Sequence, residues 1–230
     1  MNKKIAVITG AGSGLGASLT RQLSDLGYHL CLLGRNESKL EVVTHSLSND
    51  DYSIHTLDVS NYKEVKDVFD EIQSTLGDIH LLVNNAGMGA FHLLEDINEK
   101  DIDAMIDVNL KGTIYCTQQV ISSMKKNNEG VIANIISTAG LEGKINETVY
   151  CASKFGAKGF TESLLVELKD TNIQVFGAYM GGMKTEFWDD ILTEEQAEHL
   201  MDPEDIADII IGNIKKRNKL NVEKVVIKNH

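Results

Sequence analysis

The segment that decides the fold is residues 5–16, which read IAVITGAGSGLG. Its first four residues are apolar and rich in β-branched side chains, as in a buried strand. Beyond the glycines a leucine recurs at helical spacing, at Leu15, Leu19, Leu23 and Leu26. A glycine-rich turn between a strand and a helix lets the backbone approach a pyrophosphate, whose charge the helix N-terminus attracts. We therefore predict a nucleotide site here, with a turn that binds no ligand as the alternative.

The rest of the chain alternates in the same way. The predicted strands span residues 5–8, 29–33, 54–57, 79–83, 131–136, 173–178 and 222–227. Helical patterns lie between them, notably over residues 101–126 and 149–169 and after Pro203. This alternation predicts an α/β fold, a Rossmann-type doubly wound sandwich with a seven-stranded, mostly parallel sheet and helices on both faces. In such sheets ligands bind beyond the carboxyl ends of the strands.

Composition narrows the classes of function. The 230 residues are 42% hydrophobic, enough for one large core, and we expect a single domain over residues 1–230. The net charge of -12 argues against nucleic acid or an anionic membrane as a partner. The three cysteines are widely spaced, which suits free thiols in a cytoplasmic protein. The histidines show no metal-ligand spacing, and no apolar stretch approaches the ~20 residues that span a bilayer.

The end of the second strand predicts the cofactor. A dinucleotide fold that prefers NAD places a carboxylate here, against the ribose 2′-hydroxyl. This chain has Gly34 at that position, followed by Arg35 and Asn36. No carboxylate repels a 2′-phosphate, and a guanidinium grips one well. NADP(H) is therefore favoured over NAD(H), and the alternative is an ordinary solvated arginine.

Polar and small residues follow the other strands. Asp58 and Val59 follow the third, residues 84–87 (Asn-Asn-Ala-Gly) end the fourth, and Ser137 ends the fifth. All of these positions converge on one edge of the sheet. Asn109 lies inside a helical stretch, where asparagine is a poor helix former, which indicates a bend or a water site.

Tyr150 and Lys154 stand one helical turn apart. The pKa of a phenol is ordinarily near ~10 and that of a lysine near ~10.4, so neither does acid–base work unaided at neutral pH. In a closed site the ammonium would lower the pKa of Tyr150 and make it a proton donor and acceptor near pH 7. Taken alone, the motif is short enough to be an ordinary exposed helix turn.

Taken together, the chain resembles the short-chain dehydrogenase/reductase family in its compact form, from Lys4 to the end. The motifs that carry the resemblance occur in the family's order: T-G-x-x-x-G-x-G at residues 9–16, Asp58, residues 84–87, Asn109, Ser137, Tyr150-x-x-x-Lys154 and Thr185. Each motif is weak alone, but the ordered set is specific. Residues 12–17 also satisfy the general G-x-G-x-x-G/A pattern, but the strand ends too close to Gly10 for that register.

The resemblance implies hydride transfer between a nicotinamide and a carbonyl or secondary alcohol. Tyr150 would protonate the carbonyl oxygen and Ser137 would hydrogen-bond it, so both would contact the substrate. Lys154 would lower the pKa of Tyr150 and hold the nicotinamide ribose, and Asn109 would steady a water that links Lys154 to solvent. The implied cofactor contacts are Gly10, Gly12, Ser13, Gly14, Leu15, Gly16, Arg35, Asn36, Asp58, Val59, Asn85, Ala86, Gly87, Tyr150, Lys154, Gly181, Met183 and Thr185.

One position departs from the family pattern. Met180 stands where the family usually has a proline before the glycine. A proline would fix φ, so without it we expect a more mobile approach to the substrate lid, predicted around residues 180–202. Little chain follows the last strand, which favours a small or open-ended substrate.

The resemblance also bears on assembly. Relatives commonly pair through the helix with Asn109 and the helix with Tyr150, so a homodimer or homotetramer is expected. Small residues early in the helix with Tyr150 would permit close packing between subunits, although they suit packing on the sheet equally well.

Three rival functions stay open. The first is an NAD(P)-binding regulatory or redox-sensing protein without turnover, which predicts a degraded catalytic set, whereas Ser137, Tyr150 and Lys154 are all present. The second is a sugar-nucleotide epimerase or dehydratase, which needs a C-terminal substrate domain for which this chain has no room. The third is a structural oligomer with a vestigial site, against which the number of motifs argues.

Overall fold

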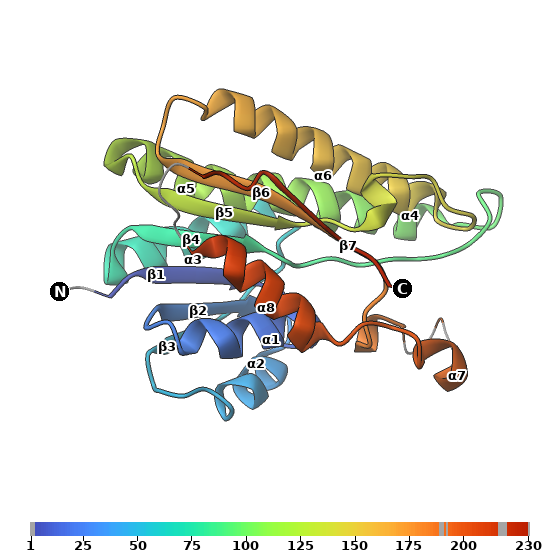
Figure 1. Ribbon diagram of the computed structural model, residues 1–230, viewed down its shortest axis with the longest axis horizontal. Helices are drawn as coiled ribbons and strands as arrows, with labels where there is room; N and C mark the ends of the chain where they lie inside the picture. Colours follow the sequence, from blue (N-terminus) through green and yellow to red (C-terminus); the bar gives the residue numbers. More distant parts are fainter. Residues whose placement is uncertain (1–2, 189–190, 192, 216–219, 230) are drawn as a thin grey trace.

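One seven-stranded sheet forms the centre of the computed structural model, which describes residues 3–188, 191, 193–215 and 220–229 (Figure 1). All strand pairs are parallel, in the spatial order β3-β2-β1-β4-β5-β6-β7. The strands are β1 (Ile5–Thr9), β2 (His29–Gly34), β3 (Tyr52–Thr56), β4 (Ile79–Asn84), β5 (Gly130–Ile135), β6 (Ile173–Met180) and β7 (Lys224–Ile227). The order reverses between β1 and β4, which is the point where doubly wound sheets bind ligands. The predicted fold class is confirmed.

Helices cover both faces of the sheet. The α-helices are α1 (Gly14–Ser24), α2 (Glu37–Thr44), α3 (Tyr62–Leu76), α4 (Glu99–Ile106), α5 (Thr113–Asn127), α6 (Thr148–Glu167), α7 (Glu194–Ala197) and α8 (Pro203–Ile214). Apolar side chains of α1, α2 and α8 pack into the core on one face, and those of α3, α5 and α6 on the other. The sequence pattern did not predict α2, because only Leu40 and Val43 of this short helix are buried.

The helix expected over residues 101–126 is interrupted. A π-helical segment, η1 (Asp107–Gly112), joins α4 to α5 and contains Asn109. A Cβ at Gly112 would lie 2.8 Å from Cγ2 of Val59, so the glycine lets this segment approach the loop after β3. The irregularity expected at Asn109 is therefore a π-helix, a feature that often marks functional sites.

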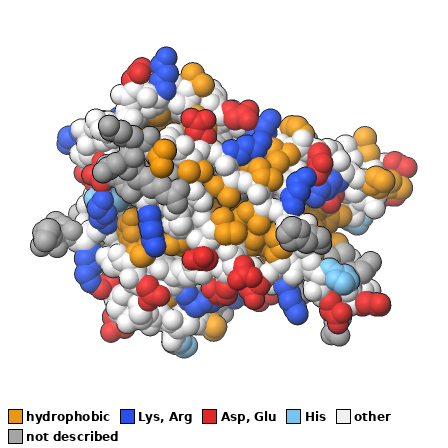
Figure 2. Space-filling view, viewed as in Figure 1, with side chains coloured by type: hydrophobic (Ala, Val, Ile, Leu, Met, Phe, Trp, Pro, Cys, Tyr) orange, Lys and Arg blue, Asp and Glu red, His pale blue; other side chains and the backbone are white. Residues whose placement is uncertain are grey.

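The strand ends lie on the side of the molecule where α7 and the β6–α8 connection project (Figure 1). α8 begins at Pro203, as the sequence predicts, and the Asp202 side chain accepts a hydrogen bond from the Glu204 N–H. β6 continues two residues further than expected, to Met180. Hydrophobic side chains gather over the face on which β7 and α8 lie (Figure 2), where Ile209 and Val226 are exposed. No helix in the described part of the chain is long and apolar enough to cross a membrane.

Candidate active site

The loops that follow the strands enclose one cavity of about 940 Å³ at the carboxyl edge of the sheet. The predicted catalytic and cofactor residues line this cavity, with two exceptions, Gly16 and Asn109. Residues far apart in the sequence are thus brought together as the convergence of strand ends predicts. Among the described residues, no group of three or more His, Cys, Asp or Glu side chains is arranged to hold a metal ion.

The glycine turn between β1 and α1 forms one wall. Gly10 and Gly14 have φ values of 63° and 49°, a region that residues with a Cβ rarely adopt. A Cβ at Gly16 would lie 2.1 Å from the Gly10 carbonyl oxygen, so Gly16 lets α1 pack on the turn rather than lining the cavity. Ser13, the N-cap residue of α1, makes no side-chain capping hydrogen bond. The first N–H groups of α1 therefore remain available to an anion.

Side-chain hydrogen bonds hold the glycine turn against the end of β4. The Asn85 Nδ2 group donates to the carbonyl oxygens of Thr9 and Gly10 at 3.0 and 3.1 Å. The Thr9 hydroxyl oxygen accepts from the N–H groups of Asn85 and Ala86, both at 3.0 Å. Thr9 and Asn85 thus fix the spacing between the glycine turn and residues 85–87, which form the opposite wall.

The end of β2 provides positive charge. Arg35 and Asn36 line the cavity where the sequence predicts them. The Asn36 side chain caps α2 by accepting a hydrogen bond from the Lys39 N–H at 3.2 Å. Lys39 also lines the cavity, and its ammonium pairs with the carboxylate of Glu186. Neither Lys39 nor Glu186 was predicted from the sequence.

The loop after β3 closes the nucleotide end. Asp58 accepts hydrogen bonds from the N–H and the hydroxyl of Ser60, at 2.9 and 2.7 Å, through one carboxylate oxygen. No hydrogen bond among the described residues uses its other oxygen, so a donor such as an adenine amine has an acceptor there. Val59 is largely buried and lines the same part of the cavity.

Asn109 supports the site from behind. It is 1% exposed, and its side chain accepts from the Met88 N–H and donates to the Met88 carbonyl, both at 2.9 Å. It also donates to the Ser153 hydroxyl at 3.0 Å, while its own carbonyl accepts from Thr113. With its side chain so engaged, Asn109 holds the loop after β4 against α6. The water-binding role implied by the resemblance stays a prediction.

Ser137, Tyr150 and Lys154 line the cavity beside the glycine turn. Ser137 follows β5, and its hydroxyl oxygen accepts a hydrogen bond from the Ala139 N–H at 3.1 Å. Tyr150 and Lys154 lie on α6 and are 8% and 5% exposed. The Lys154 Nζ atom lies 5.6 Å from the centroid of the Tyr150 ring and 3.5 Å from the carbonyl oxygen of Ile135.

The protonation equilibria differ from the sequence prediction. Burial raises the pKa of Tyr150 above that of a free phenol, and the polar side chain of Ser137 opposes this rise without cancelling it. Burial also lowers the pKa of Lys154 to about 8. The prediction that Lys154 brings the pKa of Tyr150 near neutrality is therefore wrong for the protein without a cofactor. Desolvation of the phenolate outweighs the influence of the nearby ammonium.

Aromatic rings cover Tyr150 on its open side. The Phe91 ring meets the Tyr150 ring edge to face, with centroids 5.3 Å apart, and the Phe187 ring lies 6.2 Å from it. Trp188 stacks on Phe91 with centroids 5.5 Å apart. Phe187 and Trp188 are adjacent in the sequence, but nothing in their spacing indicates which ring they face.

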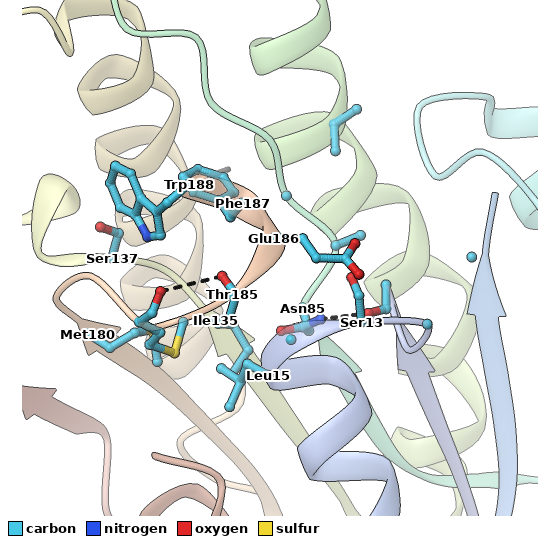
Figure 3. A pocket seen from close by; sticks show the side chains of 18 of the residues that line it. Ser13, Leu15, Asn85, Ile135, Ser137, Met180, Thr185, Glu186, Phe187 and Trp188 are labelled. Carbon is cyan, nitrogen blue, oxygen red and sulfur yellow. Dashed lines mark hydrogen bonds between the residues drawn. The ribbon is translucent and has the colours of Figure 1, made fainter. Parts of the chain in front are cut away.

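The short helix η3 (Glu186–Trp188) carries side chains toward both ends of the cavity. Figure 3 shows Trp188 on the side of Ser137, whereas Glu186 turns toward Ser13. One lid segment therefore contacts the nucleotide end and the catalytic end at once.

Met180 is the last residue of β6 and is buried. The next residue, Gly181, donates its N–H to the Ile227 carbonyl at 3.0 Å, so the start of the lid is tied to β7. Further along, Lys184 and Met201 are joined by a backbone hydrogen bond of 2.8 Å. The base of the lid is thus closed by backbone bonds, and its mobility stays a prediction.

A family model described as short chain dehydrogenase matches residues 4–196. An uncharacterized oxidoreductase of Staphylococcus aureus (strain MW2) is 32% identical over 228 residues, which cover 99% of this chain and 98% of that protein.

Two solved structures extend the comparison. A metagenomic short-chain oxidoreductase in complex with NADP is 27% identical, with a TM-score of 0.88 over 100% of this chain and 98% of the other. The closed form of serine dehydrogenase complexed with NADP⁺ is 28% identical, with a TM-score of 0.90 over 96% and 93%. The family model spans most of the chain, and the predicted motifs meet in one cavity. The protein therefore belongs to the short-chain dehydrogenase/reductase family of oxidoreductases.

Proposed function

We propose that the protein is an NADP(H)-dependent oxidoreductase that acts on a carbonyl or secondary alcohol, with Tyr150 as general acid and base. The observation that carries this proposal is that Ser137, Tyr150 and Lys154 line the same cavity as the glycine turn. A carbonyl bound at Tyr150 would share that cavity with a bound nucleotide. A regulator without turnover would have no need of these three residues together.

The residues present fit a dinucleotide. The free N–H groups at the start of α1 and the positive φ of Gly14 suit a pyrophosphate held close to the backbone. A Cβ at Gly87 would lie 3.4 Å from the Lys154 Nζ atom, so the glycine keeps space open beside the lysine. The cavity volume lies within the ~300–1,000 Å³ of ordinary ligand pockets. When bound, the nicotinamide would supply or accept the hydride.

Tyr150 and Ser137 would act on the carbonyl oxygen. The raised pKa of Tyr150 keeps its hydroxyl protonated at neutral pH, so Tyr150 already carries the proton that it would donate during reduction. Ser137 would donate a hydrogen bond to the same oxygen and stabilise the negative charge that develops on it. Giving up the proton leaves a phenolate at Tyr150, which the ammonium of Lys154 stabilises.

Reduction should therefore slow at alkaline pH. Lys154 has a pKa of about 8, so its ammonium is largely charged at pH 7 and is lost as the pH rises through that value. A pH profile of kcat/KM for NADPH, which reports groups of the free enzyme, should fall above about pH 8. A profile that rises steadily to pH 10 would contradict the role of the ammonium.

The cofactor preference rests on Arg35. Its guanidinium lines the cavity, and the end of β2 carries no carboxylate to repel a 2′-phosphate. The solved relatives described above were obtained with NADP. We expect NADPH to bind more tightly than NADH, and Arg35→Ala to weaken NADPH binding ~10- to 100-fold, the range for charge-assisted hydrogen bonds. If NADH serves as well as NADPH in wild-type turnover, the preference is wrong.

The substrate would have an apolar substituent next to its carbonyl. Phe187, Trp188 and Leu200 line the cavity, and the first two lie toward Tyr150 and Ser137 respectively. A panel of carbonyl compounds assayed for NADPH oxidation tests both the activity and this preference. Charged or strongly polar aldehydes should be the poorest substrates of the panel.

We further propose that the protein assembles as a homodimer or homotetramer through α6. Phe155 and Val166 of this helix are exposed, at 41% and 69%, although both are large and apolar. Sedimentation velocity should give a mass of two or four chains. A Val166→Asp variant should shift that mass downward, and a monomeric wild type would contradict the proposal.

A further inference from the structure

An ion pair joins two side chains in the lining of the cavity. Lys39 lies on α2 and Glu186 begins η3, and both side chains line the cavity. Among the ion pairs of the described residues, theirs is the only one whose two members both line it. The pair therefore links the lid to the helix that follows β2.

The ion pair lies at the phosphate end of the cavity. A Cβ at Gly12 would lie 3.1 Å from Cβ of Lys39, and a Cβ at Gly14 would lie 2.9 Å from Cγ2 of Thr185. The glycine turn is thus packed between α2 and the lid. Glu186 turns toward Ser13 (Figure 3), which places its carboxylate near the positive end of α1.

The neighbouring cation is available. Arg35 stands four residues before Lys39 and lines the same cavity, and its guanidinium makes no hydrogen bond or ion pair with any described residue. A chain of net charge -12 must hold a polyanionic cofactor with local cations. The two cations at this end of the cavity are the unpaired guanidinium of Arg35 and the ammonium of Lys39, which is already paired with the carboxylate of Glu186.

We propose that Lys39 and Arg35 together bind the 2′-phosphate of NADP, and that the Glu186 carboxylate stands in for this phosphate until the cofactor arrives. The inference rests on the proposed function, because it takes NADP as the cofactor. The paired side chains are 50% and 57% exposed, and ion pairs this exposed are weak. A phosphate carries more charge and more acceptor oxygens than a carboxylate, so it displaces Glu186 from Lys39.

The exchange can be followed directly. Trp188 is the only tryptophan in the chain and lies two residues from Glu186, so its fluorescence reports on the lid. We would titrate the full-length protein with NADPH and, separately, with NADH, and obtain both dissociation constants from this signal. The variants are Lys39→Gln, Lys39→Arg, Glu186→Gln and the double variant Lys39→Gln/Glu186→Gln. The matched control is Glu41→Gln, which removes an exposed carboxylate of α2 that does not line the cavity.

Lys39→Gln should weaken NADPH about tenfold, as for one lost charged hydrogen bond, and should leave NADH nearly unchanged. Lys39→Arg should bind NADPH like the wild type. Glu186→Gln should tighten NADPH up to about fivefold, the upper range for releasing an exposed ion pair. This gain should vanish in the double variant, because no ammonium is left to release. Glu41→Gln should change neither constant.

Two outcomes would overturn the inference while the proposed function stands. One is that Lys39→Gln weakens NADH as much as NADPH, or weakens neither. The other is that the gain from Glu186→Gln persists in the double variant, which would make Glu186 a general repellent of anions. Failure of the proposed function looks different. A wild type that binds neither cofactor would end both proposals, whereas one that binds NADPH without oxidising it with any carbonyl would end the proposed function alone.

Discussion

The two ends of the cavity are built in different ways. At the nucleotide end the backbone makes the site, through the positive φ of Gly10 and Gly14 and the uncapped N–H groups at the start of α1. At the catalytic end side chains make it, because aromatic rings from the loop after β4 and from η3 enclose Tyr150. A backbone site depends on a few residue types at fixed spacing. A side-chain site depends on which distant segments meet. Substitutions at the catalytic end should therefore change substrate specificity more than they change the stability of the fold.

Lys154 lies where the two ends meet and should give the largest effect. Lys154→Met removes a buried ammonium, so reductive activity should fall ~10²-fold or more. Stability at pH 7 should rise by about 3 kcal/mol, because burial lowers the pKa of Lys154 from 10.5 to about 8 and each unit is worth about 1.4 kcal/mol. Urea unfolding of both proteins at several pH values measures the difference.

The pH dependence of that difference provides the control. Between pH 8 and pH 10.5 the unfolded chain still binds a proton at this lysine and the folded protein does not, so wild-type stability rises with pH. The extra free energy of unfolding of Lys154→Met should keep its whole value below pH 8 and should vanish above about pH 10.5. A variant that is less stable than the wild type at pH 7 would show that the ammonium is favourably solvated in place.

A methyl group added to the glycine turn at the nucleotide end should have the second largest effect, which is a loss of stability. A Cβ at Gly16 would lie 2.1 Å from backbone, so Gly16→Ala should cost about 1–3 kcal/mol, as overpacking does, and should weaken NADPH binding. Gly159→Ala is the matched control, because a Cβ there meets nothing within 4 Å and α6 should gain about 0.4–1 kcal/mol. Equal unfolding midpoints for the two variants would show that Gly16 is no more tightly packed than Gly159.

A truncation at the catalytic end should have the smallest effect on folding. Trp188→Ala removes a ring that lines the cavity, which should raise KM for apolar carbonyls about three- to tenfold, as for the loss of an aromatic contact worth about 0.5–1.5 kcal/mol. The dissociation constant of NADPH, measured by calorimetry, should change less than the KM of the carbonyl. Tyr62→Ala, which removes a half-exposed ring outside the cavity, should change neither constant. A larger change for NADPH than for the carbonyl would place Trp188 with the nucleotide end.

The same contrast explains how far the sequence predicted the structure. The seven strands, the glycine turn and the shared cavity of Ser137, Tyr150 and Lys154 follow from periodicity and strand-end convergence. The irregularity at Asn109 could also be anticipated, because asparagine competes with helix hydrogen bonds.

Other features depend on non-local contacts. Phe91 and Trp188 are about a hundred residues apart, and no local pattern predicts that their rings stack. Lys39 could have been suspected from its position one turn beyond Arg35, but its partner Glu186 could not. For the protein without a cofactor, the pKa of Tyr150 was predicted in the wrong direction, because a spacing of four residues shows the nearby charge and not the burial.

The most direct test of the account is Tyr150→Phe, which removes one oxygen and keeps the ring that packs on Phe91. NADPH oxidation with the best carbonyl of the panel should fall ~10²- to 10⁴-fold, the contribution of a general acid. NADPH binding, measured by Trp188 fluorescence, should be unchanged. Oxidation at the wild-type rate by the variant, or none by a wild type that binds NADPH, would contradict the claim that Tyr150 is the acid of a working reductase.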